Sequence, residues 1–385
     1  MKFTSKLPQA GTTIFSVMSA LAADYGAINL GQGFPDYDMD ASLIDKVCWA
    51  MKEGYNQYAP MQGNTALRET LAKKVARLYQ TPLSPGQITI TPGGTYALYT
   101  SLAVLLQPGD EVILFEPCYD AYAPIIQSLG AIVVSYTLFP PDFCTDWDAV
   151  TRKLSPKTKC IIINNPNNPA GYVWKREDLL QLQSLVVEND LFLISDEVYE
   201  HLTYDGLQHQ SVLGFPELLE RSFVCFSFGK LFHCTGWKLG YCISGLRLMG
   251  EFNKIHQFNA FSVNSPMQQA LHLHLQDPTT YSTLAAFFQQ KRDLFIEKMK
   301  QSLFTLLPVK GSYFLVATYE KISNLPDDEF CKWLVATHGI ATIPLSSFYL
   351  ATEQPVKAVR FCFAKKEATL LMASEKLSQI SSTGV

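Results

Sequence analysis

The chain has 385 residues, of which 48% are hydrophobic and 17% are charged. A chain of this length can bury a large core and exceeds the usual size of one domain, so we expect two domains. The formal net charge is −4, and a mildly acidic chain lacks the basic footprint that nucleic-acid binding requires. No run reaches the roughly 18 apolar residues of a membrane span, and the N-terminus has no apolar stretch of signal-peptide length. We therefore expect a cytoplasmic protein whose ligands are small molecules, without a nucleic-acid or membrane partner.

The nine cysteines are an odd number and show no CxxC spacing. Their mostly apolar surroundings predict reduced core thiols rather than disulfides or a zinc site. His272 and His274 are the closest pair of histidines, in a segment with helical spacing. Residues two apart on a helix point to nearly opposite sides, so we expect no metal site.

In chain order, the first 40 residues are irregular and rich in glycine and proline, and strand-like and helix-like segments alternate in the middle of the chain. Helical spacing occupies most of the intervals, as in Tyr96–Leu106 and Arg176–Asn189. Apolar strands separated by helices predict a mostly parallel sheet with both faces covered. The predicted strands are Ile88–Thr91, Glu111–Phe115, Ile132–Tyr136, Cys160–Asn164, Leu191–Ser195, Phe223–Phe228 and Gly240–Ser244.

From about residue 276 the pattern changes to a long polar helix, FFQQKRDLFIEKMKQSL, followed by the strand-like segments SYFLVA and AVRFCFA. We predict an α/β protein in which residues 41–275 form a large domain. Segments 1–40 and 276–385 are predicted to join into a smaller α+β domain, so that both chain ends belong to one unit.

Ligands of open α/β sheets bind beyond the carboxyl ends of the strands, so the residues that follow each predicted strand are informative. Gly93, Gly94 and Thr95 follow the first strand and open a helix, where backbone N–H groups can meet an anion. Tyr119 follows the second strand and can stack on a planar ring. Each feature alone is also consistent with a capped turn or with ordinary packing.

The next strand ends bring amide and carboxyl groups. Asn164 and Asn168 lie in NNPNNPAG, where proline fixes the loop and leaves amides free to donate to a phenolic oxygen. Asp196 ends the following strand with Tyr199 three residues on, and a buried carboxylate there can keep a ring nitrogen protonated. An asparagine-rich turn and a helix N-cap are the ordinary alternatives.

Two lysines complete the set. Lys230 follows Ser227 after an apolar strand, and Lys238 comes eight residues later. One lysine can form a Schiff base with an aldehyde cofactor and the other can meet a phosphate, although each alone reads as a surface amine. Asp196 and Lys230 are about one βαβ unit apart, so neighbouring strands can bring them to one crevice.

Taken together, these segments identify a resemblance that extends from about residue 10 to 375. The chain resembles the class I/II aminotransferases, the fold type I pyridoxal phosphate enzymes, and within them a branch with bacterial methionine aminotransferases and the kynurenine and glutamine transaminases. The motifs that carry the resemblance are LGQGFPD, NQYAP, GGTYAL, EPCYDAY, NNPNNPAG, ISDEVYE, SFGKLFHCTGWKLGY, GSYF and VRFCFAK, with QYAPMQG, GWKLGYCI and IPLSSF for the branch.

The resemblance implies a role for each matching residue. Lys230 would form the Schiff base and then move the substrate Cα proton, Asp196 would pair with the pyridine nitrogen, and Tyr119 would stack on the ring. Tyr199 and Asn168 would bond the phenolic oxygen. The phosphate would be held by Gly94, Thr95, Ser227, Lys238 and, from the second subunit of a homodimer, Tyr58. A lysine at position 238 takes the place of the arginine found in much of the family, which keeps the charge without the bidentate fork.

On the substrate side, Arg360 in AVRFCFA matches the arginine that grips the α-carboxylate, and its apolar flanks disfavour a solvent-facing strand position. Asn168, Gly33 and Phe15 are expected to line the substrate pocket beside it. With Tyr58, Phe258 and Phe261 as further aromatic candidates, the pocket suits methionine, aromatic amino acids, kynurenine or glutamine better than aspartate.

The expected activity is therefore ping-pong transfer of the amino group of methionine or of aromatic and kynurenine-type amino acids to a 2-oxo acid. A carbon–sulfur β-lyase shares the same residues and stays an alternative. A non-catalytic cofactor or amino-acid sensor is a second alternative, disfavoured because no basic helical extension precedes residue 10. A Rossmann dehydrogenase is a third, but GQGFPD does not supply the required glycine motif between a strand and a helix.

Overall fold

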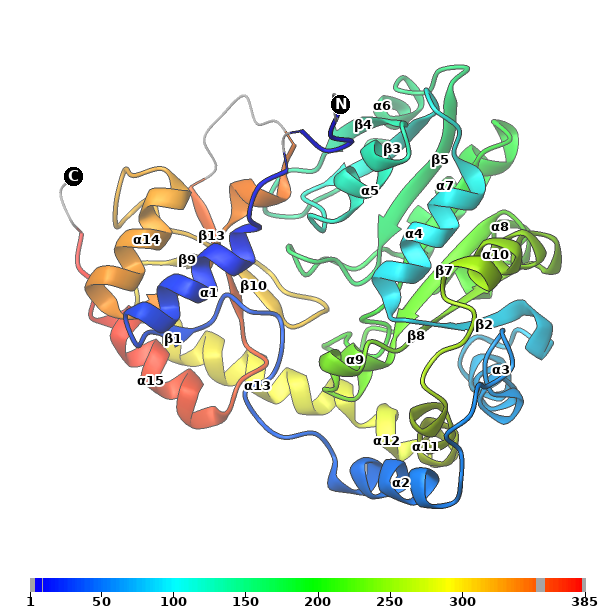
Figure 1. Ribbon diagram of the computed structural model, residues 1–385. Helices are drawn as coiled ribbons and strands as arrows, with labels where there is room; N and C mark the ends of the chain where they lie inside the picture. Colours follow the sequence, from blue (N-terminus) through cyan, green and yellow to red (C-terminus); the bar gives the residue numbers. More distant parts are fainter. Residues whose placement is uncertain (1–3, 9, 351–356, 383–385) are drawn as a thin grey trace.

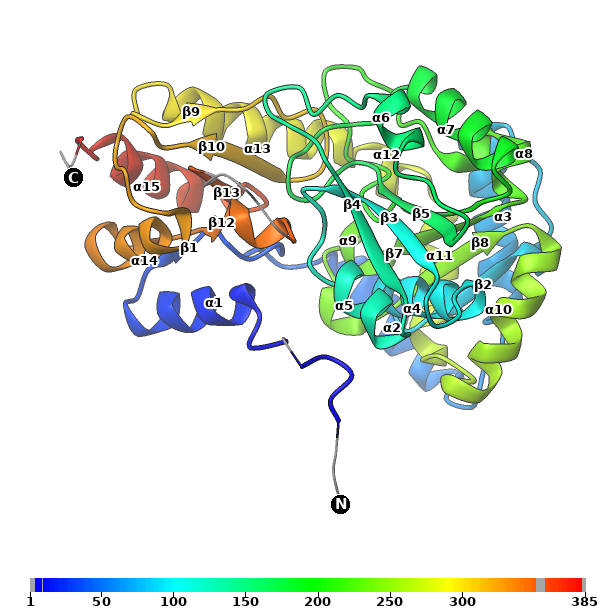
Figure 2. The ribbon, with the colours of Figure 1, turned by 90° about the horizontal axis from the view of Figure 1, so that it is seen from above.

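The structure is a computed structural model, and it describes residues 4–8, 10–350 and 357–382. Figure 1 shows two lobes side by side, one around a large sheet and one that gathers both ends of the described chain. Figure 2 shows the same arrangement from above, with helix α1 (Ile14–Asp24) beside the C-terminal elements.

Within the described residues, seven strands form the large sheet, in the order β2-β8-β7-β6-β5-β3-β4. Strands β3 to β7 run parallel, and β8 runs antiparallel to both of its neighbours. The strands are β2 (Ile88–Thr91), β3 (Glu111–Glu116), β4 (Ile132–Thr137), β5 (Thr158–Asn164), β6 (Phe192–Asp196), β7 (Ser222–Ser227) and β8 (Gly240–Ser244). These bounds agree with the predicted strands to within two residues, and the mostly parallel α/β sheet is confirmed.

The antiparallel strand has a local cause. Between β7 and β8 the chain forms only the short helix α9 (Phe228–Leu231) and the 3-10 turn η3 (Thr235–Trp237). A parallel return needs a crossover that packs on the sheet, and this connection instead stays at the strand ends. The consequence is that Lys230 and Lys238 both remain at the carboxyl edge of β7.

Helices cover both faces of the sheet because its buried strands are apolar on both sides. Ile113 and Phe115 of β3 belong to the core on one face, whereas Val112 and Leu114 belong to the core on the other. The first face is covered by α2 (Ala41–Lys52), α3 (Thr65–Tyr79), α6 (Trp147–Thr151), α7 (Arg176–Glu188), α8 (Pro216–Leu219), α11 (Ser265–Leu275) and α12 (Thr279–Ser282). The second is covered by α4 (Gly94–Leu105), α5 (Tyr122–Ser128) and α10 (Leu246–Asn259).

The smaller lobe has its own core, to which residues from both ends of the chain contribute. Its antiparallel sheet has the order β12-β13-β10-β9, and β1 (Ile28–Asn29) pairs with β11 (Ile340–Ala341). The other strands are β9 (Thr305–Leu306), β10 (Phe314–Thr318), β12 (Ile343–Pro344) and β13 (Ala358–Cys362), and the helices are α1, α13 (Leu284–Met299), α14 (Asp327–His338) and α15 (Glu367–Ser378). The pairing of β1 with β11 joins the N-terminal segment to the C-terminal segment within the smaller lobe.

We propose domain boundaries near residues 40 and 275, as expected from the sequence, since the separate cores fit this division. Residues 1–3, 9, 351–356 and 383–385 of the two end segments lie outside the described residues. Seven cysteines are buried, and Cys48 and Cys144 are exposed; all nine are free thiols. Among the described helices, none has both the length and the apolar character needed to cross a membrane.

Candidate active site

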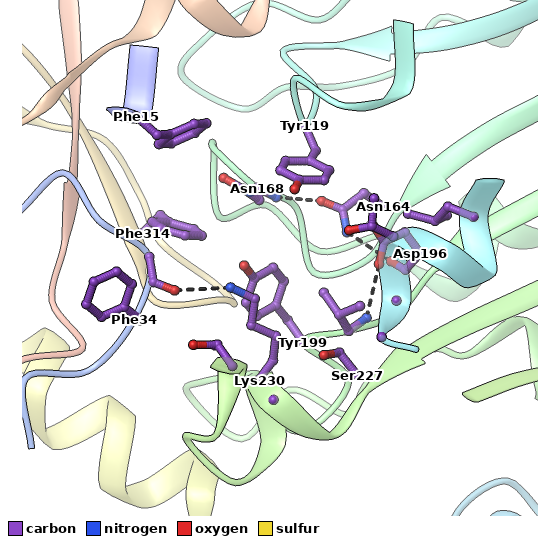
Figure 3. A pocket seen from close by; sticks show the side chains of 18 of the residues that line it. Phe15, Phe34, Tyr119, Asn164, Asn168, Asp196, Tyr199, Ser227, Lys230 and Phe314 are labelled. Atoms are coloured by element: carbon purple, nitrogen blue, oxygen red, sulfur yellow. Dashed lines mark hydrogen bonds between the residues drawn. The ribbon is translucent and has the colours of Figure 1, made fainter. Parts of the chain in front are cut away.

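The candidate active site is a cavity of about 260 Å³ at the carboxyl ends of the parallel strands. Both lobes contribute to it, because β10 and β13 of the smaller lobe carry Phe314 and Arg360 to its wall. Figure 3 shows side chains from separate elements, among them Phe314, Asn168 and Lys230, converging on the cavity. The residues predicted for the site that line it are Phe15, Gly33, Gly94, Thr95, Tyr119, Asn168, Asp196, Tyr199, Ser227, Lys230, Lys238 and Arg360.

Lys230 lies in helix α9, three residues beyond the end of β7, and its side chain enters the cavity. Its Nζ donates a hydrogen bond to the carbonyl oxygen of Gly33 at 3.1 Å, drawn as a dashed line in Figure 3. Burial lowers the pKa of this amine from 10.5 to about 8, with Arg360 adding to the effect and Asp196 opposing it. A larger fraction of such an amine is neutral near pH 7 than of a surface lysine, so more of it is available as a nucleophile or as a base.

Asp196 is the last residue of β6 and is 4% exposed. Its Oδ2 accepts a hydrogen bond from the Tyr122 hydroxyl at 2.7 Å, and its Oδ1 accepts one from the Val198 amide at 3.3 Å. Burial raises the pKa of this carboxyl from 3.8 to about 6, although both hydrogen bonds oppose the shift. A cation placed beside it would relieve this cost, so the site favours a ligand with a positively charged group here.

The asparagine loop after β5 is held by the strands beside it. The Asn164 side chain donates through Nδ2 to the Asp196 backbone carbonyl oxygen at 2.9 Å and accepts through Oδ1 from the Asn168 backbone N–H at 2.7 Å. Asn168 in turn uses its Oδ1 to accept a hydrogen bond from Arg360 Nη1 at 2.7 Å. The side-chain NH₂ group of Asn168 therefore faces away from Arg360 and can donate a hydrogen bond to a ligand oxygen.

Arg360 is a buried cation in the cavity wall. It is 1% exposed and makes no ion pair with a carboxylate of the described residues. Its Nη2 donates to the Gly31 carbonyl oxygen at 2.6 Å, its Nε has no hydrogen-bond partner among the described residues, and Phe314 stacks 3.9 Å away. Burial lowers the pKa of the guanidinium from 12.5 to about 10. A buried cation with an unsatisfied donor is a natural receptor for a carboxylate.

An anion cradle lies at the N-terminus of helix α4. Gly93 caps the helix with a φ of 86°, which a residue with a side chain rarely adopts, and the first N–H groups of the helix have no intrahelical acceptor. Gly240 makes the cradle possible: a Cβ there would lie 2.5 Å from the Phe226 carbonyl oxygen and 2.8 Å from the Gly93 carbonyl carbon. Lys238, in a left-handed conformation, places its ammonium beside Gly93. Together these groups can hold a phosphate.

Aromatic rings form the apolar side of the cavity. Phe15, Phe34 and Phe314 line it, and Phe15 packs edge-on against Phe348 at 5.9 Å between centroids. Tyr199 packs edge-on against Phe314 on the same side and is 3% exposed. These rings suit an apolar or aromatic ligand group rather than a charged one.

Three predicted aromatics do not line the cavity as this chain forms it. Tyr58 is 82% exposed and Phe258 is 86% exposed, while Phe261 packs edge-on against Tyr58 at 5.5 Å. This exposure fits the expectation that Tyr58 serves the site of a second subunit, and it removes Phe258 and Phe261 from the pocket of their own chain.

Sequence reasoning missed several contributors. Phe34 and Phe314 lie inside the quoted motifs LGQGFPD and GSYF, so the signal was present without a role attached. The backbone carbonyl of Gly33, which receives both Lys230 and the Tyr313 hydroxyl, has no sequence signal. The Tyr122 hydroxyl on Asp196 could have been found from EPCYDAY only by knowing that α5 and β6 meet.

The side chains of the cavity by themselves indicate a class of enzyme. A buried lysine of lowered pKa, a buried aspartate, a phosphate cradle and a carboxylate-binding arginine together suit an enzyme that acts on amino acids through a phosphorylated aldehyde cofactor.

The comparisons assign the family. The family model described as aminotransferase class I and II matches residues 25–377. The methionine aminotransferase of Escherichia coli is 47% identical over 98% of this chain and 98% of its own. An E. coli crystal structure described as identifying a methionine aminotransferase function superposes with a TM-score of 0.96 at 46% identity, covering 98% and 100% of the two chains. Kynurenine–oxoglutarate transaminase 3 of Mus musculus is 33% identical over 97% of this chain and 89% of its own.

The chain therefore belongs to the class I and II aminotransferases. It is an aminotransferase with the fold of the pyridoxal phosphate-dependent enzymes, and its substrates are amino acids and 2-oxo acids. This confirms the family and the activity expected from the sequence.

Proposed function

We propose that the protein uses pyridoxal 5′-phosphate to move the amino group of methionine, or of an aromatic or kynurenine-type amino acid, to a 2-oxo acid. The observation that carries the proposal is the Arg360 guanidinium, buried without a carboxylate partner among the described residues and lining the same cavity as the low-pKa lysine Lys230. This pair provides a receptor for the acid end of an amino acid and a base for its Cα proton.

The residues present fit the cofactor. Gly94, Thr95, Ser227 and Lys238 offer donors and charge for its phosphate, since all four line the cavity and the Lys238 and Ser227 side chains lie close to Gly93 and Gly94. Asp196 lies at the carboxyl end of β6 with its carboxyl buried, where a protonated ring nitrogen would offset the cost of ionisation. Tyr119 lines the same wall and presents a ring face for stacking.

When bound, the cofactor supplies an aldehyde that condenses with amines and a ring that accepts the electrons of the broken Cα–H bond. Lys230 has two tasks in our proposal. Its amine would hold the cofactor between turnovers, and as a free amine it would carry the substrate Cα proton, first as base and then as acid. The lowered pKa of Lys230 supports this role, because a base must be neutral at the working pH.

Asp196, Tyr199 and Asn168 set the charge of the ring. Asp196 would pair with the ring nitrogen and keep it protonated, which would help the ring to accept electrons. Tyr199 and Asn168 line the same cavity and would donate hydrogen bonds to the phenolic oxygen. Asn168 also accepts from Arg360, so one amide connects cofactor orientation with carboxylate binding.

Substrate choice rests on the aromatic side of the cavity. Phe15, Phe34 and Phe314 place apolar surface where a side chain would extend, and a charged side chain would lose hydration there without a partner. The relative at 47% identity is a methionine aminotransferase. Methionine is therefore our first choice and the aromatic and kynurenine-type amino acids the second.

We also propose that the enzyme works as a homodimer, with Tyr58 reaching the phosphate of the neighbouring site. Its 82% exposure leaves the hydroxyl available to a second copy. Analytical ultracentrifugation with activity measured across the same concentrations tests this. A fully active monomer would overturn the role of Tyr58.

The main test is the absorbance of the purified protein after loading with pyridoxal phosphate. We expect a band near 420 nm, roughly where a protonated Schiff base of this cofactor absorbs, and we expect methionine to bleach it while 4-methylsulfanyl-2-oxobutanoate is released. Phenylalanine and kynurenine serve as second-choice donors and aspartate as the matched charged control. Lys230→Ala should show no such band. Bleaching by aspartate at the rate seen with methionine would contradict the proposed substrate class.

A further inference from the structure

The apolar side of the cavity includes a loop, residues 31–36, that follows β1 and belongs to no helix or strand. Gln32, Gly33 and Phe34 of this loop line the cavity. Figure 3 shows Phe34 and Phe314 on the same side of the pocket. A loop without strand pairing still needs partners for its backbone groups. The position of Phe34 therefore depends on the side chains that bind the loop.

The loop backbone packs directly against the smaller lobe. A Cβ added at Gly33 would lie 2.9 Å from Phe314 Cζ, and one added at Gly31 would lie 3.0 Å from Ile343 Cδ1. The absence of a side chain at both positions allows this close approach. Because the contacts are so short, a shift of the loop would change the shape of the pocket wall.

Lys365 is a buried cation that binds this loop. It lies three residues beyond the end of β13, is 3% exposed and forms no ion pair with a carboxylate of the described residues. Its Nζ donates to the Phe34 carbonyl oxygen at 2.8 Å and to the Gln32 carbonyl oxygen at 3.4 Å, and it lies 5.3 Å from the centre of the Phe34 ring. A buried ammonium needs hydrogen bonds to offset its lost hydration, and the loop supplies them.

Other donors to the loop backbone belong to the active site itself. Arg360 donates to the Gly31 carbonyl oxygen, and Lys230 donates to the Gly33 carbonyl oxygen. In the proposed function the cofactor is attached to the Lys230 amine, which is then no longer free to hold the loop. Lys365 does not line the cavity, so its bonds to the loop do not compete with a ligand there.

We propose that Lys365 is a positioning residue for substrate selectivity, which holds the 31–36 loop so that Phe34 faces the side chain of the substrate. The inference rests on the proposed function, in which the aromatic side of the cavity receives the side chain of methionine. Lys365 acts through Phe34 and touches neither substrate nor cofactor. Its loss weakens contacts to a long apolar side chain and leaves the binding of the substrate carboxylate in place.

The first test measures binding without turnover. 4-(Methylsulfanyl)butanoate is methionine without its amino group, and propanoate is alanine without its amino group, so neither can react. Calorimetric titration of the cofactor-loaded protein gives both dissociation constants. In Lys365→Met we expect the constant for the longer acid to rise roughly tenfold or more, about the effect of one methylene of apolar contact, and that for propanoate to change less than about twofold. Lys366→Met, which removes an exposed neighbouring lysine, should bind both acids as the wild type does.

The second test is kinetic and distinguishes positioning from general damage. In Lys365→Met, kcat/KM for methionine should fall roughly tenfold, mainly through KM, while that for alanine changes less than about threefold. Phe34→Ala should lose the same selectivity. The double variant should lose little more than Phe34→Ala alone, because residues that act through one contact are not additive. Thr369→Val removes the hydroxyl that donates to Asp36 at 2.6 Å, at the other end of the loop, and should shift selectivity in the same direction.

The outcomes separate this inference from the proposed function. A wild-type protein that binds the longer acid no more tightly than propanoate would overturn the proposed substrate class and this inference with it. Equal losses for the long and the short ligands in Lys365→Met, or fully additive losses in the double variant, would overturn the positioning role alone. If Lys365→Met does not fold, unchanged selectivity in Thr369→Val would overturn that role in its place.

Discussion

The sharpest consequence of the site geometry concerns Arg360, and it can be tested by removing either the guanidinium or the group that the guanidinium binds. Arg360→Met keeps an unbranched apolar side chain beside Phe314 but removes the guanidinium, and with it the charge that lies over the Phe314 ring. Arg360→Lys keeps the charge and abolishes the planar fork. The second half of the experiment compares methionine with 3-(methylsulfanyl)propylamine, which is methionine without its carboxylate.

The expected magnitudes follow from the contacts. A hydrogen bond to a charged group contributes about 1.5–3 kcal/mol, and a buried fork can make two to one carboxylate. Arg360→Met should therefore cost about 3–6 kcal/mol, or roughly a 10²- to 10⁴-fold loss of kcat/KM for methionine. Arg360→Lys loses one of the two bonds and should cost roughly 10- to 100-fold. The amine makes neither bond, so its kcat/KM should change by less than about threefold in both variants.

The amine also reports indirect damage. Arg360 Nη1 holds the Asn168 side chain, so a variant could weaken the cofactor orientation as well as carboxylate binding. Steady-state rates with both donors, alongside the absorbance of the bound cofactor, separate the two effects. If the amine loses as much activity as methionine, Arg360 acts through Asn168 and the carboxylate receptor is wrongly assigned.

Two further predictions use the same site. Burial raises the pKa of Asp196 from 3.8 to about 6, so the folded state binds this proton more tightly than the unfolded state and loses stability as pH rises from about 4 to about 6, by about 3 kcal/mol in total. Thermal unfolding of the cofactor-free protein should therefore show this loss in the wild type and not in Asp196→Asn; parallel pH profiles would contradict it. Gly240→Ala pushes a methyl against the backbone at Phe226 and Gly93, an overpacking that costs about 1–3 kcal/mol. Cofactor affinity, measured by fluorescence titration, should fall roughly 5- to 100-fold, whereas Gly250→Ala, with open space around it, should bind normally.

Much of the fold could be predicted because the parallel strands are buried on both faces. Such strands are short continuous apolar runs, and the flanking turns mark their ends, as in Glu111–Glu116 and Phe192–Asp196. The strand order could not be predicted, because apolar runs look alike whichever neighbour they have. The antiparallel direction of β8 depends on the path of residues 228–239, whose short helical turns have no strong sequence period.

Some residues of the site could likewise be predicted from the sequence, and others could not. Asn168, Asp196 and Lys230 were found because they lie at or just beyond the carboxyl ends of predicted strands, where open α/β sheets bind their ligands. The backbone groups were not, since the carbonyl of Gly33 acquires its role only when the N-terminal segment folds over β10.

The charges of the site share one property that connects stability to function. Burial shifts the pKa of Lys230 and of Arg360 downward and that of Asp196 upward, so each group is pushed toward its neutral form. The protein thus keeps three groups in an environment that penalises their charges. The ligands in the proposed function bring the opposite charges, a carboxylate to Arg360 and a protonated ring nitrogen to Asp196. Ligand binding would then offset the desolvation penalty that the buried charges carry in the folded protein. The site can therefore hold Asp196 and Arg360 in place before the ligand arrives, and binding is still favourable in free energy.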